Sequence, residues 1–174
     1  NEGNAPFILH YGQPTDVTVV LFHGLSDSPF FLRFIAEALH QQGMTVVVGL
    51  FPGHGLKQAD DDMEDSDLGK RWQQRVESTM KFANGLSKTV YIGGFSTGGT
   101  LASSYTLQHP EDVDALLLFS GALALEESVE DMAGIWGIKL LAKILDGHYE
   151  TAGPNPYKYP QVSNFAALVL VDII

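Results

Sequence analysis

Apolar runs that suit buried strands alternate along the chain with segments whose apolar residues recur at helical spacing. Residues 17–22 form an apolar run that is typical of a buried parallel strand. A helix is predicted over residues 30–42, and a β-branched strand follows at residues 44–50. The alternation continues with a helix over residues 68–84 and a strand at residues 89–92.

Two of the predicted helices have an apolar face, which indicates the side expected to be buried. For the earlier helix these residues are Phe31, Ile35, Ala38 and Leu39, and for the later helix they are Leu68, Trp72, Val76, Met80 and Ala83. A helix over residues 97–109 and a strand at residues 115–119 complete the pattern. Strands that alternate with helices predict βαβ units, and therefore an α/β fold with a mostly parallel sheet and helices on both faces.

The pattern changes after Gly121. Residues 126–145 are expected to be helical, residues 147–160 form a turn-rich link, and residues 161–174 are apolar at helical spacing. This segment lacks the alternation of strand and helix that would predict another βαβ unit. We therefore expect residues 126–165 to leave the sheet as a helical lid.

A single domain is expected over residues 1–174, with its core at residues 1–125. Asp172 lies near the end of the last apolar segment. If this segment is a strand, the carboxylate would end it and is a candidate catalytic acid. The spacing favours a helix, in which case Asp172 is incidental. The chain ends inside this apolar segment, so we expect a domain that is incomplete at its C-terminus.

Composition and charge narrow the function classes. The chain has 174 residues, of which 45% are hydrophobic and 18% are charged, as in one folded domain with a substantial core. A formal net charge of -11 disfavours binding to nucleic acid and to anionic membranes. Cysteine is absent, which excludes disulfides and thiolate ligands or nucleophiles. The apolar runs are shorter than the roughly 20 residues of a membrane span. No signal peptide is visible at the N-terminus, which favours a cytoplasmic location.

The segment Gly94-Phe95-Ser96-Thr97-Gly98 lies where a predicted strand becomes a helix, and it fits the G-x-S-x-G pattern of a nucleophile elbow. On such a sharp turn the residues two before and two after the serine come close together, so glycine avoids a clash. The turn would expose the Ser96 hydroxyl, with the Thr97 N–H at the helix N-terminus beside it. The alternative is a tight turn with a hydrogen-bonded core serine.

A second loop, Phe22-His23-Gly24-Leu25, follows the first parallel strand. An oxyanion hole in this type of site takes one N–H from the residue after the nucleophile and another from an earlier strand-to-helix loop. Gly24 allows close approach of the backbone, and the Leu25 N–H would be the second donor. His23 is expected to shape this loop through bonds to the backbone. An ordinary turn is the alternative for His23 and Gly24.

With these motifs the chain resembles the α/β-hydrolases, close to the carboxylesterase and monoacylglycerol-lipase group. The matching segments are VVLFHGLSDSPFFLRFIAEAL, GLFPGHG, YIGGFSTGGTLA and DALLLFSGAL, which together cover roughly residues 15–125. The resemblance implies that Ser96 is the nucleophile and that the N–H groups of Leu25 and Thr97 form the oxyanion hole. It also implies that His54 anchors a structural loop. Leu25 replaces the aromatic residue of many relatives, which changes the pocket wall.

A serine nucleophile needs a base and an orienting acid, which in this family follow it in the chain. His109 lies beyond a helix of twelve residues, about 18 Å from Ser96 at about 1.5 Å per residue. His148 lies in the expected lid, which is a poor place for a base that must be held rigidly. We therefore expect the catalytic acid and histidine to lie outside this chain.

These observations predict a serine hydrolase that cleaves small carboxylic esters through an acyl-enzyme, without a metal or cofactor. An acyl chain is expected in an apolar pocket formed by Leu25, Phe30, Ile135, Leu140 and Leu141. Two alternatives remain open. One is a catalytically silent acyl-binding or interaction module, and the other is an amide or peptide hydrolase on the same scaffold. The sequence leaves the oligomeric state open.

Overall fold

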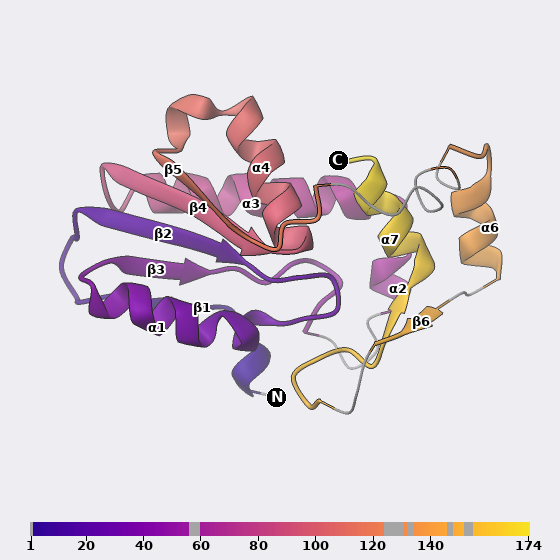
Figure 1. Ribbon diagram of the computed structural model, residues 1–174, viewed down its shortest axis with the longest axis horizontal. Coiled ribbons are helices and arrows are strands. Elements are labelled where there is room, and N and C mark those ends of the chain that lie inside the picture. Colours follow the sequence, from indigo (N-terminus) through magenta and orange to yellow (C-terminus); the bar gives the residue numbers. More distant parts are fainter. Residues whose placement is uncertain (1, 56–59, 124–130, 132–133, 146–147, 152–154) are drawn as a thin grey trace.

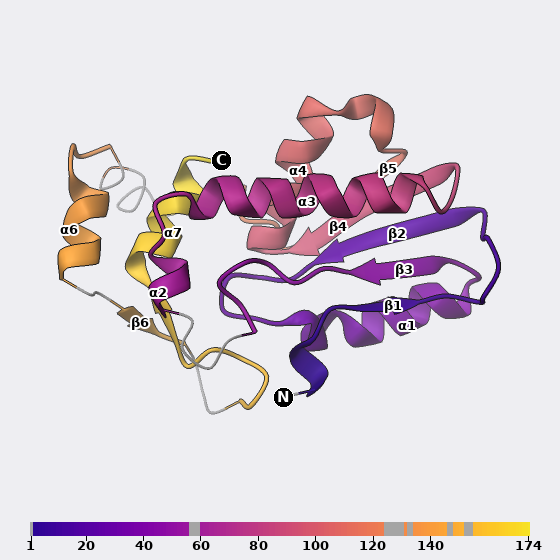
Figure 2. The ribbon, with the colours of Figure 1, turned by 180° about the vertical axis from the view of Figure 1, so that it is seen from behind.

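The computed structural model describes residues 2–55, 60–123, 131, 134–145, 148–151 and 155–174 (Figure 1). Part of the helix expected over residues 126–145 therefore lies outside the described residues. A five-stranded sheet forms the centre of the molecule, and helices pack on both of its faces (Figure 1, Figure 2). The α/β fold predicted from the apolar pattern is confirmed.

The strand order in this sheet is β1-β3-β2-β4-β5. The strands are β1 (Phe7–Leu9), β2 (Val17–Phe22), β3 (Thr45–Val48), β4 (Thr89–Phe95) and β5 (Ala115–Phe119). The pairs β2–β3, β2–β4 and β4–β5 are parallel, as expected, whereas β1 pairs antiparallel with β3. The β1 edge strand was not predicted, because three residues are too few to show an alternation. The parallel register sets Phe22 at the end of β2 opposite Gly94 of β4.

The described helices cover the two faces of the sheet unequally. They are η1 (Glu2–Asn4), η2 (Pro29–Leu32), α1 (Arg33–Gln41), α2 (Asp60–Met63), α3 (Leu68–Asn84), α4 (Thr97–Gln108), η3 (Pro110–Asp112), α6 (Ile138–Ile144) and α7 (Asn164–Val171). α1 covers one face, while α3 and α4 cover the other (Figure 1, Figure 2). None of the helices in the described part of the chain is both long and apolar enough to span a bilayer.

The apolar face predicted for the helix over residues 30–42 is partly wrong. The residues that this segment buries fully are Leu32 and Ala36, whereas Phe31 and Ala38 are exposed. The segment begins with the 3-10 turn η2 before α1 starts at Arg33. A 3-10 turn has 3.0 residues per turn instead of 3.6, which rotates the buried face relative to a continuous α-helix.

α3 buries the face that its sequence predicts. Leu68, Trp72, Val76, Met80 and Ala83 are all at most 1% exposed. The Trp72 indole N–H also donates a hydrogen bond to the Pro52 carbonyl at 3.0 Å. α3 therefore packs against the sheet and also fixes the loop that follows β3.

An acidic run such as residues 60–62 is typical of a solvated loop, but here it begins the short helix α2. Met63 at the end of α2 is 1% exposed and joins the main core. Burial of Met63 therefore attaches α2 to the main core.

The described residues of the expected lid contain α6 and two short strands, β6 (His148–Glu150) and β7 (Gln161–Ser163), which pair antiparallel, and α7 follows β7. The helix predicted for the last segment is confirmed at Asn164–Val171, whereas residues 161–163 form β7 and residues 148–150 of the expected turn-rich link form β6. Asp172 is the C-terminal cap of α7, which decides between the two alternatives for this residue, and its carboxylate pairs with Lys139. Phe165, Ala166 and Val169 of α7 pack into the main core beside α3. This helix is therefore part of the core.

Candidate active site

Ser96 lies on the turn between β4 and α4, and its backbone is strained. Its φ is 50° and its ψ is -117°, a conformation that residues other than glycine rarely adopt. Hydrogen bonds hold the backbone there. The Ser96 N–H donates to the Phe119 carbonyl at 3.2 Å, and the Ser96 carbonyl accepts from the N–H groups of Thr100 and Ala122 at 3.1 and 3.3 Å. The end of β5 and the first turn of α4 thus fix the position of the serine.

Two glycines permit this turn for steric reasons. A Cβ atom on Gly94 would lie 2.4 Å from the Gly98 carbonyl carbon and 2.6 Å from the Phe22 carbonyl oxygen. A Cβ atom on Gly98 would lie 2.1 Å from the same Phe22 oxygen and 2.8 Å from the His23 oxygen. Because all of these neighbours are backbone atoms, no side-chain movement could relieve the overlap. The turn is packed directly against the end of β2.

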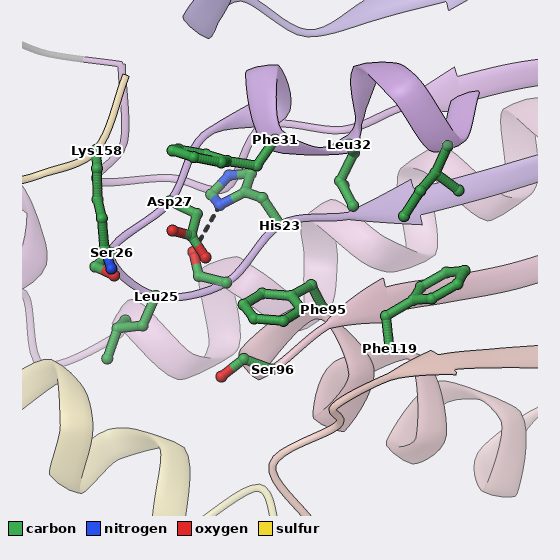
Figure 3. A pocket seen from close by; sticks show the side chains of 12 residues that line it. His23, Leu25, Ser26, Asp27, Phe31, Leu32, Phe95, Ser96, Phe119 and Lys158 are labelled. Carbon is green, nitrogen blue, oxygen red and sulfur yellow. Dashed lines mark hydrogen bonds between the residues drawn. The ribbon is translucent and has the colours of Figure 1, made fainter. Parts of the chain in front are cut away.

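A cavity of about 400 Å³ opens beside Ser96 (Figure 3). Apolar side chains that line it are Leu25, Phe31, Leu32, Ile35, Phe95 and Phe119. The Ser96 hydroxyl projects from the turn on the side of Leu25 and away from Phe119 (Figure 3). The serine side chain is half-buried and therefore accessible from the cavity.

The acyl pocket expected from the sequence is only partly right. Leu25 lines the cavity, but four other expected residues do not. The Phe30 ring instead stacks on Tyr157, with ring centres 3.5 Å apart. Ile135, Leu140 and Leu141 are 56%, 63% and 47% exposed, because α6 and the residues before it lie outside α7, away from the sheet (Figure 1). Helical apolar spacing could not distinguish these exposed residues from pocket residues.

Two buried histidines support the loop after β2. His23 Nδ1 donates to the Gly24 carbonyl at 2.8 Å, and His23 Nε2 accepts from the Phe51 N–H at 3.2 Å. His54 Nε2 donates to the Leu25 carbonyl at 2.7 Å. Burial lowers the pKa of both imidazoles, and for His23 the neighbouring His54 lowers its pKa further. Both rings are therefore held neutral, and their hydrogen bonds to backbone atoms stabilise the loop that contains Leu25.

Leu25 lines the same cavity as Ser96, and Thr97 directly follows Ser96 in the chain. Among the described residues, no acceptor is bonded to either N–H group. Thr97 is the first residue of α4, where helix N–H groups have no intrahelical partner and the helix dipole is positive. The loop after β2 turns at Gly24, because the Gly24 carbonyl accepts a hydrogen bond from the Asp27 N–H at 3.2 Å.

The structure adds two charged residues to the cavity that sequence reasoning missed, Asp27 and Lys158. Asp27 is 8% exposed. Burial raises the pKa of the Asp27 carboxyl, and the positive charge of Lys158 partly opposes this rise. The two residues are 131 positions apart in the chain, so no local sequence pattern could have brought them together.

Neither of the histidines that follow Ser96 lines the cavity. His148 begins β6, where it pairs with Ser163 of β7. His109 follows α4 and packs against Tyr105 with the two rings tilted by 31° and their centres 4.6 Å apart. Since His23 is the only histidine on the cavity wall within the described residues, and both of its ring nitrogens are bonded to backbone, the described residues bring no free imidazole to Ser96.

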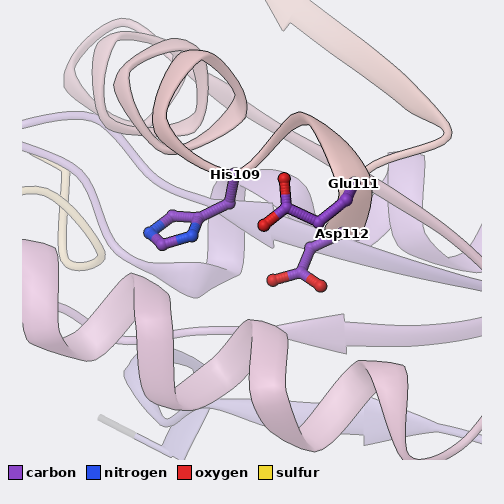
Figure 4. A group of neighbouring side chains, drawn as sticks. All are labelled: His109, Glu111 and Asp112. Atoms are coloured by element: carbon purple, nitrogen blue, oxygen red, sulfur yellow. The ribbon is translucent and has the colours of Figure 1, made fainter.

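His109 also belongs to a small cluster with Glu111 and Asp112 at the far end of α4 (Figure 4). One potential ligand atom from each residue lies within 4.8 Å of the others, which is the spacing a metal ion could use. Glu111 is exposed, however, and Asp112 already accepts a hydrogen bond from the Tyr105 hydroxyl at 3.0 Å. These contacts describe a solvated corner of the fold, remote from the cavity beside Ser96.

Comparison of the sequence with known proteins identifies relatives. The chain matches the family described as serine aminopeptidase, S33, over residues 13–167. The thermostable monoacylglycerol lipase of Bacillus sp. (strain H-257) is 30% identical over 132 residues. That match covers 76% of this chain and 50% of the lipase, so the chain spans about half the length of this curated relative.

Solved structures of lipases and esterases share the fold. One is a structure from work on LipS and LipT, two metagenome-derived lipolytic enzymes. It has a TM-score of 0.80 and 22% sequence identity, and the match covers 98% of this chain and 68% of that chain. Another is a monoacylglycerol lipase from Paleococcus ferrophilus, with a TM-score of 0.68 and 19% identity over 97% of this chain and 70% of that chain. At such identities the likeness establishes the fold alone. Because the family match extends over most of its length, the chain belongs to the serine aminopeptidase S33 family and has the α/β-hydrolase fold.

Proposed function

We propose that this chain carries the nucleophile and oxyanion hole of a serine hydrolase that cleaves carboxylic esters. One observation carries the proposal: Ser96 occupies a strained backbone conformation at the wall of the cavity, with glycines where side chains would clash. A strained residue persists only where the surrounding structure holds it, and such residues concentrate at functional sites. A serine needed only for packing would not require this turn.

In the proposed reaction, Ser96 Oγ attacks the ester carbonyl carbon while its proton passes to a histidine. The N–H groups of Leu25 and Thr97 donate to the oxyanion that forms. Their lack of other acceptors among the described residues supports this assignment, as does the position of Thr97 at the positive end of α4. Collapse of the intermediate expels the protonated alcohol and leaves an acyl group on Ser96, which water then hydrolyses.

We infer that the histidine and the acid of this relay lie outside the 174 residues. The described histidines near the cavity are engaged with backbone, and Asp172 caps α7 and pairs with Lys139. The chain also spans about half the length of the Bacillus lipase that it matches. The proposed chemistry uses no metal or cofactor.

The cavity wall supports an ester with an apolar acyl group. The cavity is lined by aromatic and aliphatic surface from Phe31, Ile35, Phe95 and Phe119. The curated relative is named a monoacylglycerol lipase, which agrees with an ester substrate. The family description also includes aminopeptidases, so amide hydrolysis is the competing reaction to test.

The test uses protein expressed from the complete coding sequence, assayed with p-nitrophenyl butyrate and with leucine p-nitroanilide. The variants are Ser96→Ala and, as a matched control on the same helix, Ser104→Ala. We expect ester hydrolysis in the wild type and in Ser104→Ala, and a loss of at least about a thousandfold in kcat/KM in Ser96→Ala. A folded wild type that binds but does not cleave either substrate would support the silent acyl-binding module. Faster cleavage of the anilide would support a peptidase.

A further inference from the structure

Asp27 is a buried carboxylate that faces the cavity without a hydrogen-bond partner among the described residues. It is 8% exposed and lines the same wall as Leu25 and Ser96. A Cβ atom built on Gly24 would lie 2.5 Å from Asp27 Oδ2 and 3.4 Å from Ser96 Cβ, so the carboxylate and the serine are near neighbours. Among the described residues, the buried polar atoms that lack both solvent contact and a partner do not include the Asp27 oxygens, so the carboxylate is open to the cavity, where a ligand that donates to it can replace water.

Lys158 brings a positive charge to the same part of the cavity. Its side chain runs down to the turn that contains Ser26 and Asp27 (Figure 3). The described ion pairs do not include one between Lys158 and Asp27, so their charged atoms are separated by more than 4.0 Å. The two charged side chains therefore line the same cavity without forming a direct ion pair.

The backbone on both sides of Lys158 is fastened to the loop that contains Asp27. The Tyr159 N–H donates to the Ser26 carbonyl at 2.8 Å, and the Ser28 hydroxyl donates to the Tyr157 carbonyl at 2.8 Å. Tyr157 also stacks on Phe30. These contacts anchor the backbone at Lys158 beside the loop that contains Asp27, so only the lysine side chain has to be ordered when a ligand binds.

We propose that Asp27 and Lys158 form a polar subsite that binds a neutral, hydroxylated group of the ester, and that this pair determines substrate specificity. A hydroxyl can donate to the Asp27 carboxylate and accept from the Lys158 ammonium, and two adjacent hydroxyls can satisfy both residues at once. A neutral ligand matches the opposite charges of the pair, whereas an anion would be repelled by Asp27 and a cation by Lys158. This inference rests on the proposed function, because it assumes that the cavity beside Ser96 is the substrate site.

The test is a binding experiment that needs no turnover. The probes are 1-O-hexylglycerol, a non-hydrolysable ether with two hydroxyls, and hexyl methyl ether, which has none. Their dissociation constants are measured by NMR titration of protein expressed from the complete coding sequence. The variants are Asp27→Ala and Lys158→Met, with Lys81→Met on the exposed side of α3 as the control. We expect each subsite variant to weaken hexylglycerol binding about tenfold, the loss typical of a hydrogen bond to a charged group. Neither variant should change binding of the plain ether more than about twofold.

Three results would overturn the subsite: no measurable binding of hexylglycerol to the wild type, equal losses for both ethers, or unchanged hexylglycerol binding in both variants. Hexylamine is tested as a cationic probe. If it binds more tightly than hexylglycerol, and if this binding is lost in Asp27→Ala, the proposal is also overturned, because Asp27 would then recognise a cation. If the ethers behave as expected but the Ser96→Ala variant hydrolyses esters normally, the proposed nucleophile fails while the subsite stands. If Asp27→Ala does not fold, Lys158→Met alone still tests the subsite.

Discussion

At the scale of single residues, the site depends on a few positions where the backbone conformation restricts which residue type can be accommodated. Ser96 is held at a positive φ by hydrogen bonds to Phe119, Thr100 and Ala122. Gly98 is packed against the Phe22 carbonyl so closely that one added methyl group would overlap backbone atoms. The sequence motif could be recognised because this geometry restricts both positions at once.

Replacing Gly98 by alanine should therefore destabilise the whole domain. The new Cβ would lie 2.1 Å from the Phe22 carbonyl oxygen, and the backbone of β2 cannot move without breaking its pairing with β4. We expect the free energy of unfolding to fall by about 3 kcal/mol, measured by urea denaturation followed by circular dichroism. Gly121→Ala is the matched control, because its Cβ would meet its nearest neighbour at 3.5 Å. Equal stability of the two variants would show that the turn is not tightly packed.

The buried carboxylate of Asp27 gives a second prediction at this scale. Burial raises its pKa above 3.8, so ionisation is less favourable in the folded chain than in the unfolded chain. Well below pH 3.8 both states are protonated and the residue does not affect stability. As the pH rises from 3.8 through the folded pKa, the wild type loses stability. Asn at this position cannot ionise. The stability of Asp27→Asn relative to wild type should therefore increase between about pH 4 and about pH 7 in urea titrations. A difference that stays constant or shrinks with rising pH would contradict the burial argument.

At the scale of elements, the loops after β2 and β3 are joined by a pair of imidazoles. His23 and His54 lie with ring centres 4.7 Å apart, and their nitrogens bond the backbone of Gly24, Leu25 and Phe51. Tyr159 extends this contact to the segment after β6, since its ring packs edge-on against His54 and its hydroxyl accepts from the Gly55 N–H. The loop that would supply the Leu25 donor is thus held in place by the loop after β3 and by Tyr159 from the segment after β6.

This support should make stability sensitive to acid. The folded pKa of both histidines is below 6.5, so their contribution is complete above pH 6.5 and is lost as the pH falls. Each histidine adds at most about 1.4 kcal/mol per pH unit to the loss. His54→Gln should show a shallower decline in unfolding free energy between pH 7 and pH 5 than wild type, with exposed His10→Gln as the control. Identical slopes for all three proteins would mean that His54 is not held neutral by the fold.

At the scale of the whole molecule, parallel pairing brings together segments that are far apart in the sequence. The loop after β2 and the turn after β4 meet because those strands are neighbours in the same direction, and the end of β5 then fixes Ser96 from the other side. The cavity lies at the carboxyl ends of these strands, where ligands bind in open α/β sheets. Lys158 completes its wall from a segment that leaves the sheet altogether.

The sequence was sufficient for the parts of the fold governed by local pattern. The continuous apolar runs of β2 and β5 predicted these strands, and the periodic apolar stripe of α3 predicted both the helix and its buried side. The parts that the pattern did not predict depend on other physics. The 3-10 turn before α1 shifted the helix face, and β1 was too short to show alternation. Asp27 resembled an ordinary loop residue, because its burial depends on tertiary packing with Lys158 and the turn at Ser96.

The most direct measurement is covalent labelling of protein expressed from the complete coding sequence with a fluorophosphonate, followed by peptide mass spectrometry. An activated serine forms a phosphonyl ester, whereas an ordinary serine does not react at the same rate. The label should be found on Ser96, should disappear in Ser96→Ala, and should persist in Ser104→Ala. A folded protein that hydrolyses esters but carries the label on a different serine, or a folded protein with no label on Ser96, would contradict the assignment of Ser96 as the nucleophile.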